Sequence, residues 1–414
     1  MAKQWLIIFF FIGNILIFSQ EDKRYPPSID VNTITWKPYN QPTKEPSSYL
    51  KYFTEDCVNV IRIGDQKAFG ETGQQVGHNY ATNAVWNSDG SLLKLNVKPA
   101  KILYDSNYTV AYTRNLPSWS CWSYINPYIM YGTQNGNQFV SYNVTNDERT
   151  VLHTFHNYTK LSIGKGEGRQ DRSDTLICLV AEDQNGIGHL IVYNIKTNTV
   201  IATKNIGDSS DLDWASVSPL GNYVIAAWHK NGTDEKEGYR IFNSNLTNEK
   251  HLYTETQHSD IGIDVNGDEV LVAIGNKTVW KTNHYIAMIR LKDGLLKPLF
   301  YDEPTKPRGI WGGWVSCQNT KRDGWAYISE DRASDDVMAN EIFAIKLDYS
   351  NNNIVQRFGK HHSDKHNSKN AYYHGARACV NPDGTKICFD SNYGDSVLKT
   401  WEHAPAWIME YPQE

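Results

Sequence analysis

Four histidines are spaced so that they could act together. His78, His258 and His374 stand at closely similar distances ahead of a glycine turn, and His229 directly follows the apolar segment 223–228. Imidazole exchanges protons near neutral pH and also binds divalent metals. The repeated spacing indicates that equivalent structural units carry these side chains. The set therefore offers acid–base or metal chemistry, provided that the fold gathers it in one place.

The repeating unit is clearest in 371–391, AYYHGARACVNPDGTKICFDS. Apolar and polar residues alternate on both sides of 381–384, where proline presets φ and glycine accepts the positive φ of a tight turn. This pattern predicts a strand, a turn and a second strand. Similar turns lie near residues 90, 127, 173, 221, 267 and 324. Units of about 40 to 60 residues that repeat in this way are typical of β-propeller blades, so seven turns predict seven blades.

Two isolated strands predict how the ring closes. The segment 57–64, CVNVIRIG, alternates like a strand but has no partner turn, and 404–411, APAWIMEY, is isolated in the same way. We expect both in the last blade, because pairing the two ends of the chain would remove open sheet edges. The predicted fold class is all-β, a seven-bladed β-propeller closed by an N-terminal strand.

The remaining organisation follows from composition. Residues 1–20 carry one lysine, an apolar run and a small polar end, which is typical of a secretory signal peptide. We expect an extended N-terminal arm over 21–56 and one propeller domain over 57–414. The protein is predicted to be a secreted or periplasmic monomer, with no membrane insertion after signal removal. A net charge of −5 argues against non-specific nucleic-acid binding.

Export would permit disulfide bonds among the six cysteines. Cys379 and Cys388 flank the seventh turn on adjacent predicted strands and could face each other. The pattern fits either a bridge or two buried thiols.

Propeller topology predicts which of these residues lie on the same face of the ring. The first strand of each blade lines the central channel, and the loops that enter it and that follow the second strand lie on the same side. His78, His258 and His374 should begin inner strands, and His229 should end the second strand of blade four. Arg240 begins the next strand. We expect a polar functional site at this mouth of the channel.

Common catalytic and nucleotide-binding signatures are absent from the sequence. No P-loop, zinc-finger spacing, GxSxG elbow or HExxH motif occurs, and the glycine-rich 164–168 opens no predicted helix. A glycosidase would need two opposed carboxylates. Glu167, Asp211, Asp213 and Asp260 fall on the same predicted rim, so hydrolysis stays an alternative.

Two segments carry a resemblance to a known family. VNPDGTKICFDSNYG (380–394) and HSDIGIDVNGDEV (258–270) resemble the oligogalacturonate lyases of polysaccharide lyase family 22. Tyr223 followed by Arg240 resembles, more weakly, the ulvan lyases of families 24 and 25. The resemblance implies a seven-bladed propeller that cleaves acidic sugars by β-elimination with a bound divalent metal.

The resemblance also implies residue roles. His258 matches a metal ligand, and His374 falls near a second, although the family enters blade seven with two histidines and a glutamine. His229 and Arg240 match catalytic positions. We consider that His258 and His374 share Mn²⁺, Ca²⁺ or Zn²⁺, with Cys317 between them as a less favoured ligand. The alternative is a metal-free rim whose histidines contact the substrate carboxylate directly.

Elimination from a 4-linked uronate needs groups of these types. A cation neutralises the carboxylate, a base removes the C5 proton, and an acid protonates the leaving oxygen. We assign His229 as the base and Arg240 as the cation, with Tyr239 or Tyr223 as proton donors and His78 as the rival base. The predicted function is an exported lyase for an acidic, uronate-containing polysaccharide or oligosaccharide. The alternatives are a non-catalytic propeller that binds glycan or protein, and a glycoside hydrolase.

Overall fold

Strands make up almost all of the regular structure. The computed structural model describes residues 22–30, 53–55, 58–63, 77–96, 101–229, 237–253, 258–274, 284–301, 313–331, 338, 340–350, 353–363, 375–393 and 404–412. Within these ranges no helix is long and apolar enough to cross a membrane.

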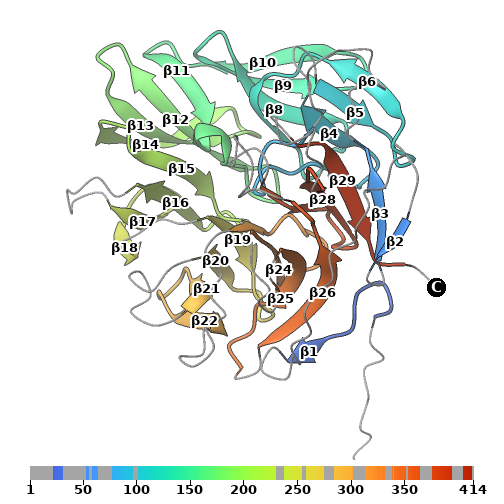
Figure 1. Cartoon of the computed structure of the whole chain (residues 1–414). Coiled ribbons are helices and arrows are strands. Elements are labelled where there is room, and N and C mark those ends of the chain that lie inside the picture. The colour runs from blue at the N-terminus through green and yellow to red at the C-terminus, as the bar shows by residue number, and fades with distance from the viewer. Residues whose placement is uncertain are drawn as a thin grey trace, which may run out of the picture.

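Seven antiparallel sheets follow one another along the chain and form a ring (Figure 1). Blade one contains β4 (Leu93–Asn96), β5 (Lys101–Tyr104) and β6 (Val110–Arg114). Blade two contains β7 (Ser118–Trp122), β8 (Ile129–Gln134), β9 (Gln138–Asn143) and β10 (Glu148–Thr154). Blade three contains β11 (Tyr158–Ile163), β12 (Leu176–Asp183), β13 (Gly188–Asn194) and β14 (Thr199–Gly207). The inner position of blade one is supplied by Trp86, which bridges to Leu93.

The remaining blades repeat the same order from the channel outward. Blade four contains β15 (Leu212–Val217), β16 (Tyr223–Trp228), β17 (Gly238–Asn243) and β18 (Lys250–Tyr253). Blade five contains β19 (Ser259–Ile263), β20 (Glu269–Ile274), β21 (His284–Arg290) and β22 (Leu296–Tyr301). Blade six contains β23 (Gly313–Ser316), β24 (Trp325–Glu330), β25 (Glu341–Lys346) and β26 (Ile354–Lys360). Seven blades confirm the predicted fold class.

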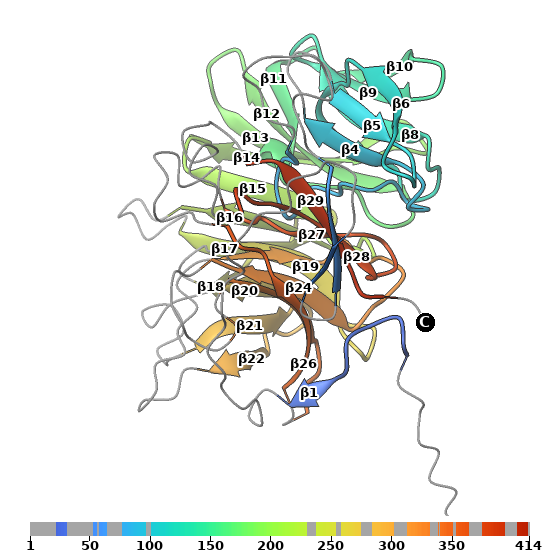
Figure 2. The same cartoon turned by 45° about the vertical axis from the view of Figure 1, so that its right-hand side comes forward.

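The ring is closed by the N-terminal strand, as predicted. Blade seven combines β27 (Cys379–Val380), β28 (Lys386–Asp390) and β29 (Ala406–Glu410) with β3 (Val58–Arg62) (Figure 2). In the pairing of β29 with β3, Ile61 lies opposite Ile408. The preceding segment is also used: β2 (Phe53–Glu55) extends this sheet, and β1 (Ile29–Asp30) pairs with the outer strand β26 of blade six. Added strands of this kind cover sheet edges that would otherwise expose unpaired backbone groups.

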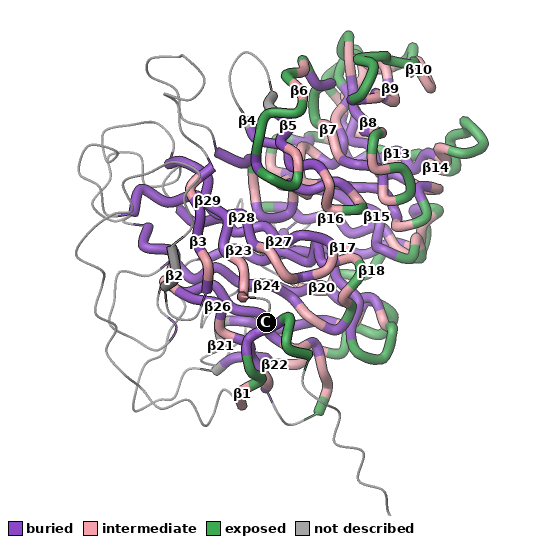
Figure 3. Tube along the Cα trace, turned by 90° about the vertical axis from the view of Figure 1, so that its right-hand side faces the viewer, coloured by how far each residue is buried: buried purple, intermediate pink, exposed green. Residues whose placement is uncertain are grey.

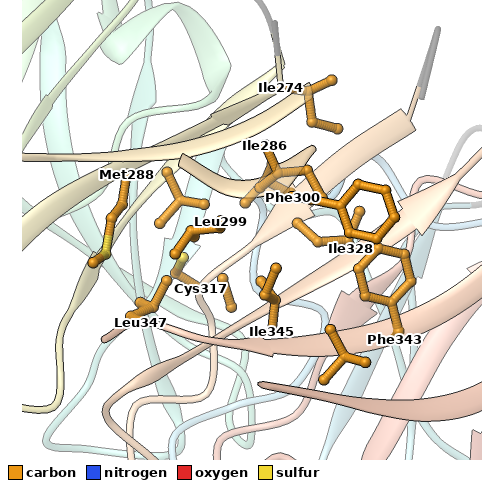
Figure 4. Close-up of a cluster of buried hydrophobic side chains, with 14 of the residues drawn as sticks. Ile274, Ile286, Met288, Leu299, Phe300, Cys317, Ile328, Phe343, Ile345 and Leu347 are labelled. Carbon is orange, nitrogen blue, oxygen red and sulfur yellow. The ribbon is translucent and has the colours of Figure 1, made fainter. Parts of the chain in front are cut away.

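The hydrophobic core lies between neighbouring blades. Central strands such as β16 and β20 are buried on both faces, whereas the outer strand β10 of blade two is largely exposed (Figure 3). The cluster between blades five and six includes Met288, Leu299, Phe343 and Leu347 (Figure 4). Each fully buried side chain of this size contributes about 1.5–3 kcal/mol. This packing fixes the blades relative to one another and so fixes the channel.

The seventh turn brings two thiols together. Cys379 on β27 lies directly opposite Cys388 on β28, and both side chains are fully buried. The five cysteines within the described ranges are all free thiols. Of the two possibilities left open by the sequence, the structure shows the pair of buried thiols.

Candidate functional site

A bulge interrupts the innermost strand of blade three. β11 ends at Ile163, opposite Leu179, and the strand resumes at Gln170, which bridges to Ile177. Residues 164–169 therefore lie opposite a single residue of β12 and bulge out of the sheet around the 3-10 turn η3 (Gly164–Gly166). Bulges of this kind aim side chains at functional sites.

Glycines let the bulge pack closely against blade four. A Cβ on Gly164 or Gly168 would collide with the carbonyl oxygen of Ala215 in the inner strand β15. Lys165 adopts a left-handed conformation with φ 54°, and its Nζ donates hydrogen bonds of 2.8 and 2.6 Å to two backbone carbonyl oxygens of the segment that enters β15. The glycine-rich segment is thus a tightly fixed bulge that presents Glu167.

Glu167 has an unusual electrostatic environment. Burial raises the pKa of its carboxyl group from the ordinary 4.5 to about 8, and the negative charges of Asp213 and Asp260 add to the effect. The nearby hydroxyl of Thr82 acts in the opposite direction. At neutral pH Glu167 therefore keeps its proton and can donate it, which is the state that a general acid requires.

His229 lies beside one of these two carboxylates, Asp213. It follows β16 and is exposed, and its backbone N–H donates a 2.8 Å hydrogen bond to the carbonyl oxygen of Asp211. Its Nε2 is 3.2 Å from Oδ1 of Asp213. When Asp213 accepts the Nε2 proton, the neutral imidazole has its lone pair on Nδ1. Asp213 therefore contacts His229, a candidate base, and acts electrostatically on Glu167, a candidate acid.

The segment that enters blade one reaches across the channel. Nε2 of Gln318, in blade six, donates a 2.8 Å hydrogen bond to the carbonyl oxygen of Thr82. The ring of Tyr80 meets that of His258, at the start of blade five, edge to face with a centroid distance of 6.1 Å. Residues 79–83 therefore connect the histidine of blade five with the acidic side of the mouth, where the hydroxyl of Thr82 lowers the pKa of Glu167.

A cavity of about 580 Å³ opens at this mouth. It is lined by blades one to three: Asn79, Tyr80, Asn83, Leu116, Pro117, Ser118, Trp119, Ser120, Lys165, Gly166 and Glu167. Aromatic rings, amides, hydroxyls and one ammonium group surround the Glu167 carboxyl. This mixture suits a polyhydroxylated ligand that carries negative charge.

A buried ion pair supports the floor of the channel. Nη2 of Arg169 is 2.7 Å from Oδ1 of Asp260. Oδ2 of Asp260 also accepts hydrogen bonds from the backbone N–H of Cys317 and from Gln318, at 2.6 and 3.2 Å. The carboxylate of Asp260 that this network holds in place is one of the two that raise the pKa of Glu167.

The structure engages two of the predicted catalytic residues, Arg240 and Tyr239, with other protein groups. Arg240 lies on the third strand of blade four, where Nη1 is 3.0 Å from Glu249. The hydroxyl of Tyr239 is buried and donates a 2.9 Å hydrogen bond to Ser259 Oγ. Tyr223 begins β16 and His229 follows its end, so the two lie at opposite ends of that strand. Of this set, His229 contacts Asp213, whose charge also acts on Glu167.

His78 is part of the ring closure. Its buried Nδ1 is 3.1 Å from Asp390 of blade seven, and Nε2 contacts the carbonyl oxygen of Arg377. Nη2 of Arg377 lies 2.6 Å from the same carboxylate. Burial alone would raise the pKa of Asp390, but the charges of His78 and Arg377 hold it below its ordinary value. Both ring nitrogens of His78 are thus engaged with protein groups.

The proposed metal ligands differ in how well they fit the role. Nδ1 of His258 is 2.5 Å from the carbonyl oxygen of Gly313, and the ring stacks on Trp314 at 5.3 Å. A backbone carbonyl on Nδ1 fixes the tautomer that directs the Nε2 lone pair toward a metal. His374 lies outside the described residues, but the adjacent Gly375 packs against Trp314.

Cys317 does not fit a metal site. Its side chain lies in the cluster between blades five and six, beside Leu347 (Figure 4), and burial raises the pKa of the thiol well above its ordinary value. Metals bind the thiolate, which this environment disfavours. No group of three or more histidine, cysteine or acidic side chains suited to a metal occurs within the described ranges.

Three residues of the mouth were missed from the sequence. Lys165 lies in the glycine-rich segment of which only Glu167 was considered for the site, Trp119 in a tryptophan-rich stretch, and Tyr80 two residues beyond His78. A glycine-rich run inside an otherwise regular inner strand was the available signal for a bulge.

Comparison with solved structures supports the fold. No protein-family model matches the chain, and no curated protein matches it either. An oligogalacturonate lyase in complex with manganese superposes with a TM-score of 0.59 at 12% identity, over 94% of this chain and 98% of that one. An oligogalacturonate lyase from Vibrio parahaemolyticus gives a TM-score of 0.59 at 11% identity, over 94% and 99%. The chain is therefore similar to oligogalacturonate lyases in fold, whereas the likeness to ulvan lyases stays a prediction.

Proposed function

We propose that the protein is an exported lyase that cleaves a uronate-containing acidic glycan by β-elimination. The observation that carries this proposal is that Asp213 acts on two groups at once: it lies 3.2 Å from the exposed imidazole of His229, and its charge helps to raise the pKa of Glu167. His229 and Glu167 provide the base and the acid, and their propeller has the fold of the oligogalacturonate lyases.

The reaction divides between these two side chains. His229, oriented by Asp213, accepts the C5 proton of the uronate on Nδ1. The electron pair of the broken C–H bond forms the C4=C5 double bond as the C4–O bond breaks. Glu167 donates its proton to the departing oxygen, so it replaces the tyrosines considered from the sequence. The products are an unsaturated uronate and a shortened glycan, and charge and atoms balance.

The uronate carboxylate must be neutralised before its neighbouring proton becomes acidic enough to remove. Lys165 supplies a fixed positive charge in the cavity that holds Glu167. A divalent ion bound by His258 and His374 would add Lewis-acid neutralisation of the same carboxylate. Arg240 is not assigned to this step, because Glu249 already pairs with it.

The test is a panel of acidic glycans, with ultraviolet absorbance of the unsaturated uronate as the readout. We expect absorbance to rise on one uronate class, and His229→Ala to remove the increase while the thermal melt stays that of a folded protein. Failure of every uronate glycan to give the unsaturated product, with and without added Mn²⁺, would refute the proposal.

One observation favours glycoside hydrolysis as the second candidate. A protonated Glu167 and the nearby Asp213 are two carboxyl groups in different protonation states, which is the combination that glycosidases use. Release of reducing ends without the unsaturated product would support this alternative.

A further inference from the structure

Trp119 has an unusual conformation and location. It lies near the start of β7, the inner strand of blade two, where the pairing register shifts between Ser118 and Cys121. Its backbone is left-handed, with φ 53°, and 52% of the residue is exposed. A bulky residue with positive φ is strained by about 1–3 kcal/mol, and such strain clusters at functional sites.

The indole ring of Trp119 packs at a defined position at the edge of the cavity. A Cβ added to Gly166 would lie 2.6 Å from Cζ3 and 2.7 Å from Cε3 of Trp119, so the ring packs on the backbone of the blade-three bulge. Gly166 directly precedes Glu167. The register shift in β7 and the bulge of blade three thus place an exposed aromatic ring beside the proton donor.

The groups around this ring match the surface of a pyranose. Asn79, Asn83, Ser118 and Ser120 line the same cavity and supply amide and hydroxyl groups. A sugar presents polar hydroxyls at its rim and C–H groups on its faces. Those C–H groups pack against the electron-rich face of an indole, and the hydroxyls bond to the surrounding polar side chains.

We propose that Trp119 is the stacking platform of a sugar subsite, which binds the pyranose unit next to the one that is cleaved. This inference rests on the proposed function for the identity of the glycan. The left-handed backbone directs the ring into the cavity, and the Gly166 backbone supports it. The subsite gives the mouth its preference for a chain of sugars over a single uronate.

The variants for the test are Trp119→Ala, Trp119→Phe and, as a matched control, Tyr128→Ala. Tyr128 is a similarly exposed aromatic, 44%, in the turn between β7 and β8 at the other end of the same strand pair. We expect Trp119→Ala to raise KM for oligogalacturonides about tenfold, which corresponds to about 1.4 kcal/mol of lost binding. Its kcat should stay close to wild type, Trp119→Phe should recover most of the loss, and Tyr128→Ala should change neither constant.

A calorimetric titration separates this inference from the proposed function. Oligogalacturonides and, as neutral probes, cello-oligosaccharides are titrated into wild type and into each folded variant. Trp119-dependent binding, together with no turnover of any uronate glycan in the panel, would support the subsite and refute the lyase. Turnover with unchanged KM and affinity in Trp119→Ala would refute the subsite and leave the lyase. Absence of binding to every oligosaccharide would also overturn the subsite. Trp119→Leu, which keeps a large apolar side chain but has no aromatic face, serves as the test if Trp119→Ala does not fold, and it should raise KM in the same way.

Discussion

Glu167→Gln should change how stability depends on pH. Folding raises the pKa of this carboxyl from 4.5 to about 8, so the folded state holds a proton that the unfolded chain loses near pH 4.5. Below that pH the stabilising contribution of the Glu167 carboxyl group to the folded state is fully present. Its contribution declines as pH rises from about 4.5 to 8 and is lost above the folded pKa. Glutamine is neutral throughout and removes this dependence.

The magnitude follows from the size of the pKa shift. Each unit corresponds to about 1.4 kcal/mol, but Glu167 lines an open cavity and solvent screens part of the effect, so we expect a loss on the order of 2 kcal/mol. Urea unfolding of wild type and Glu167→Gln across this pH range measures it. The variant should be the more stable protein at alkaline pH. Glu182→Gln, which alters a surface carboxylate 2.6 Å from Lys160 in the same blade, is the control and should follow wild type.

The same substitution tests catalysis. Glutamine cannot donate a proton to the leaving oxygen, so turnover should fall by about 10²- to 10⁴-fold. In wild type, activity should decline above about pH 8 as Glu167 loses its proton. Parallel stability curves for wild type and Glu167→Gln, together with unchanged turnover, would show that this carboxyl titrates normally and takes no part in the reaction.

Other residues of the mouth and of the ring closure give further predictions. His229→Ala should lower kcat by about 10²-fold or more. Wild-type turnover in His229→Ala, with activity abolished in His78→Ala, would move the base to blade one. Otherwise His78→Ala should lower the free energy of unfolding by about 3–5 kcal/mol, because it removes a partner of the buried Asp390 carboxylate. This loss is measured by urea unfolding, and wild-type stability would contradict it. Chelation of metal should reduce activity, and His258→Ala should weaken Mn²⁺ binding in a calorimetric titration. Full activity of the metal-free protein would remove the metal from the proposal.

The sequence by itself determined the number of blades and the closure of the ring. Alternating apolar residues and turn glycines such as Gly384 are local signals, because strand periodicity and positive φ depend on a few neighbouring residues. The partner of 57–64 could be inferred because each end of the chain carries an unpaired strand. Pairing these two strands with each other is the arrangement that removes open sheet edges. The position of His229 after β16 followed from the same topology.

Only the tertiary structure decided which side chains meet. Glu167 acquires its high pKa from burial and from Asp213 and Asp260, residues distant in the chain that the ring brings to one mouth. Arg240 has Glu249 as its partner because of the register between strands, which no local pattern specified. The bulge at 164–169 and the left-handed Trp119 depend on contacts between blades two, three and four. Electrostatics and close packing act through space, so they appear only when the ring has formed.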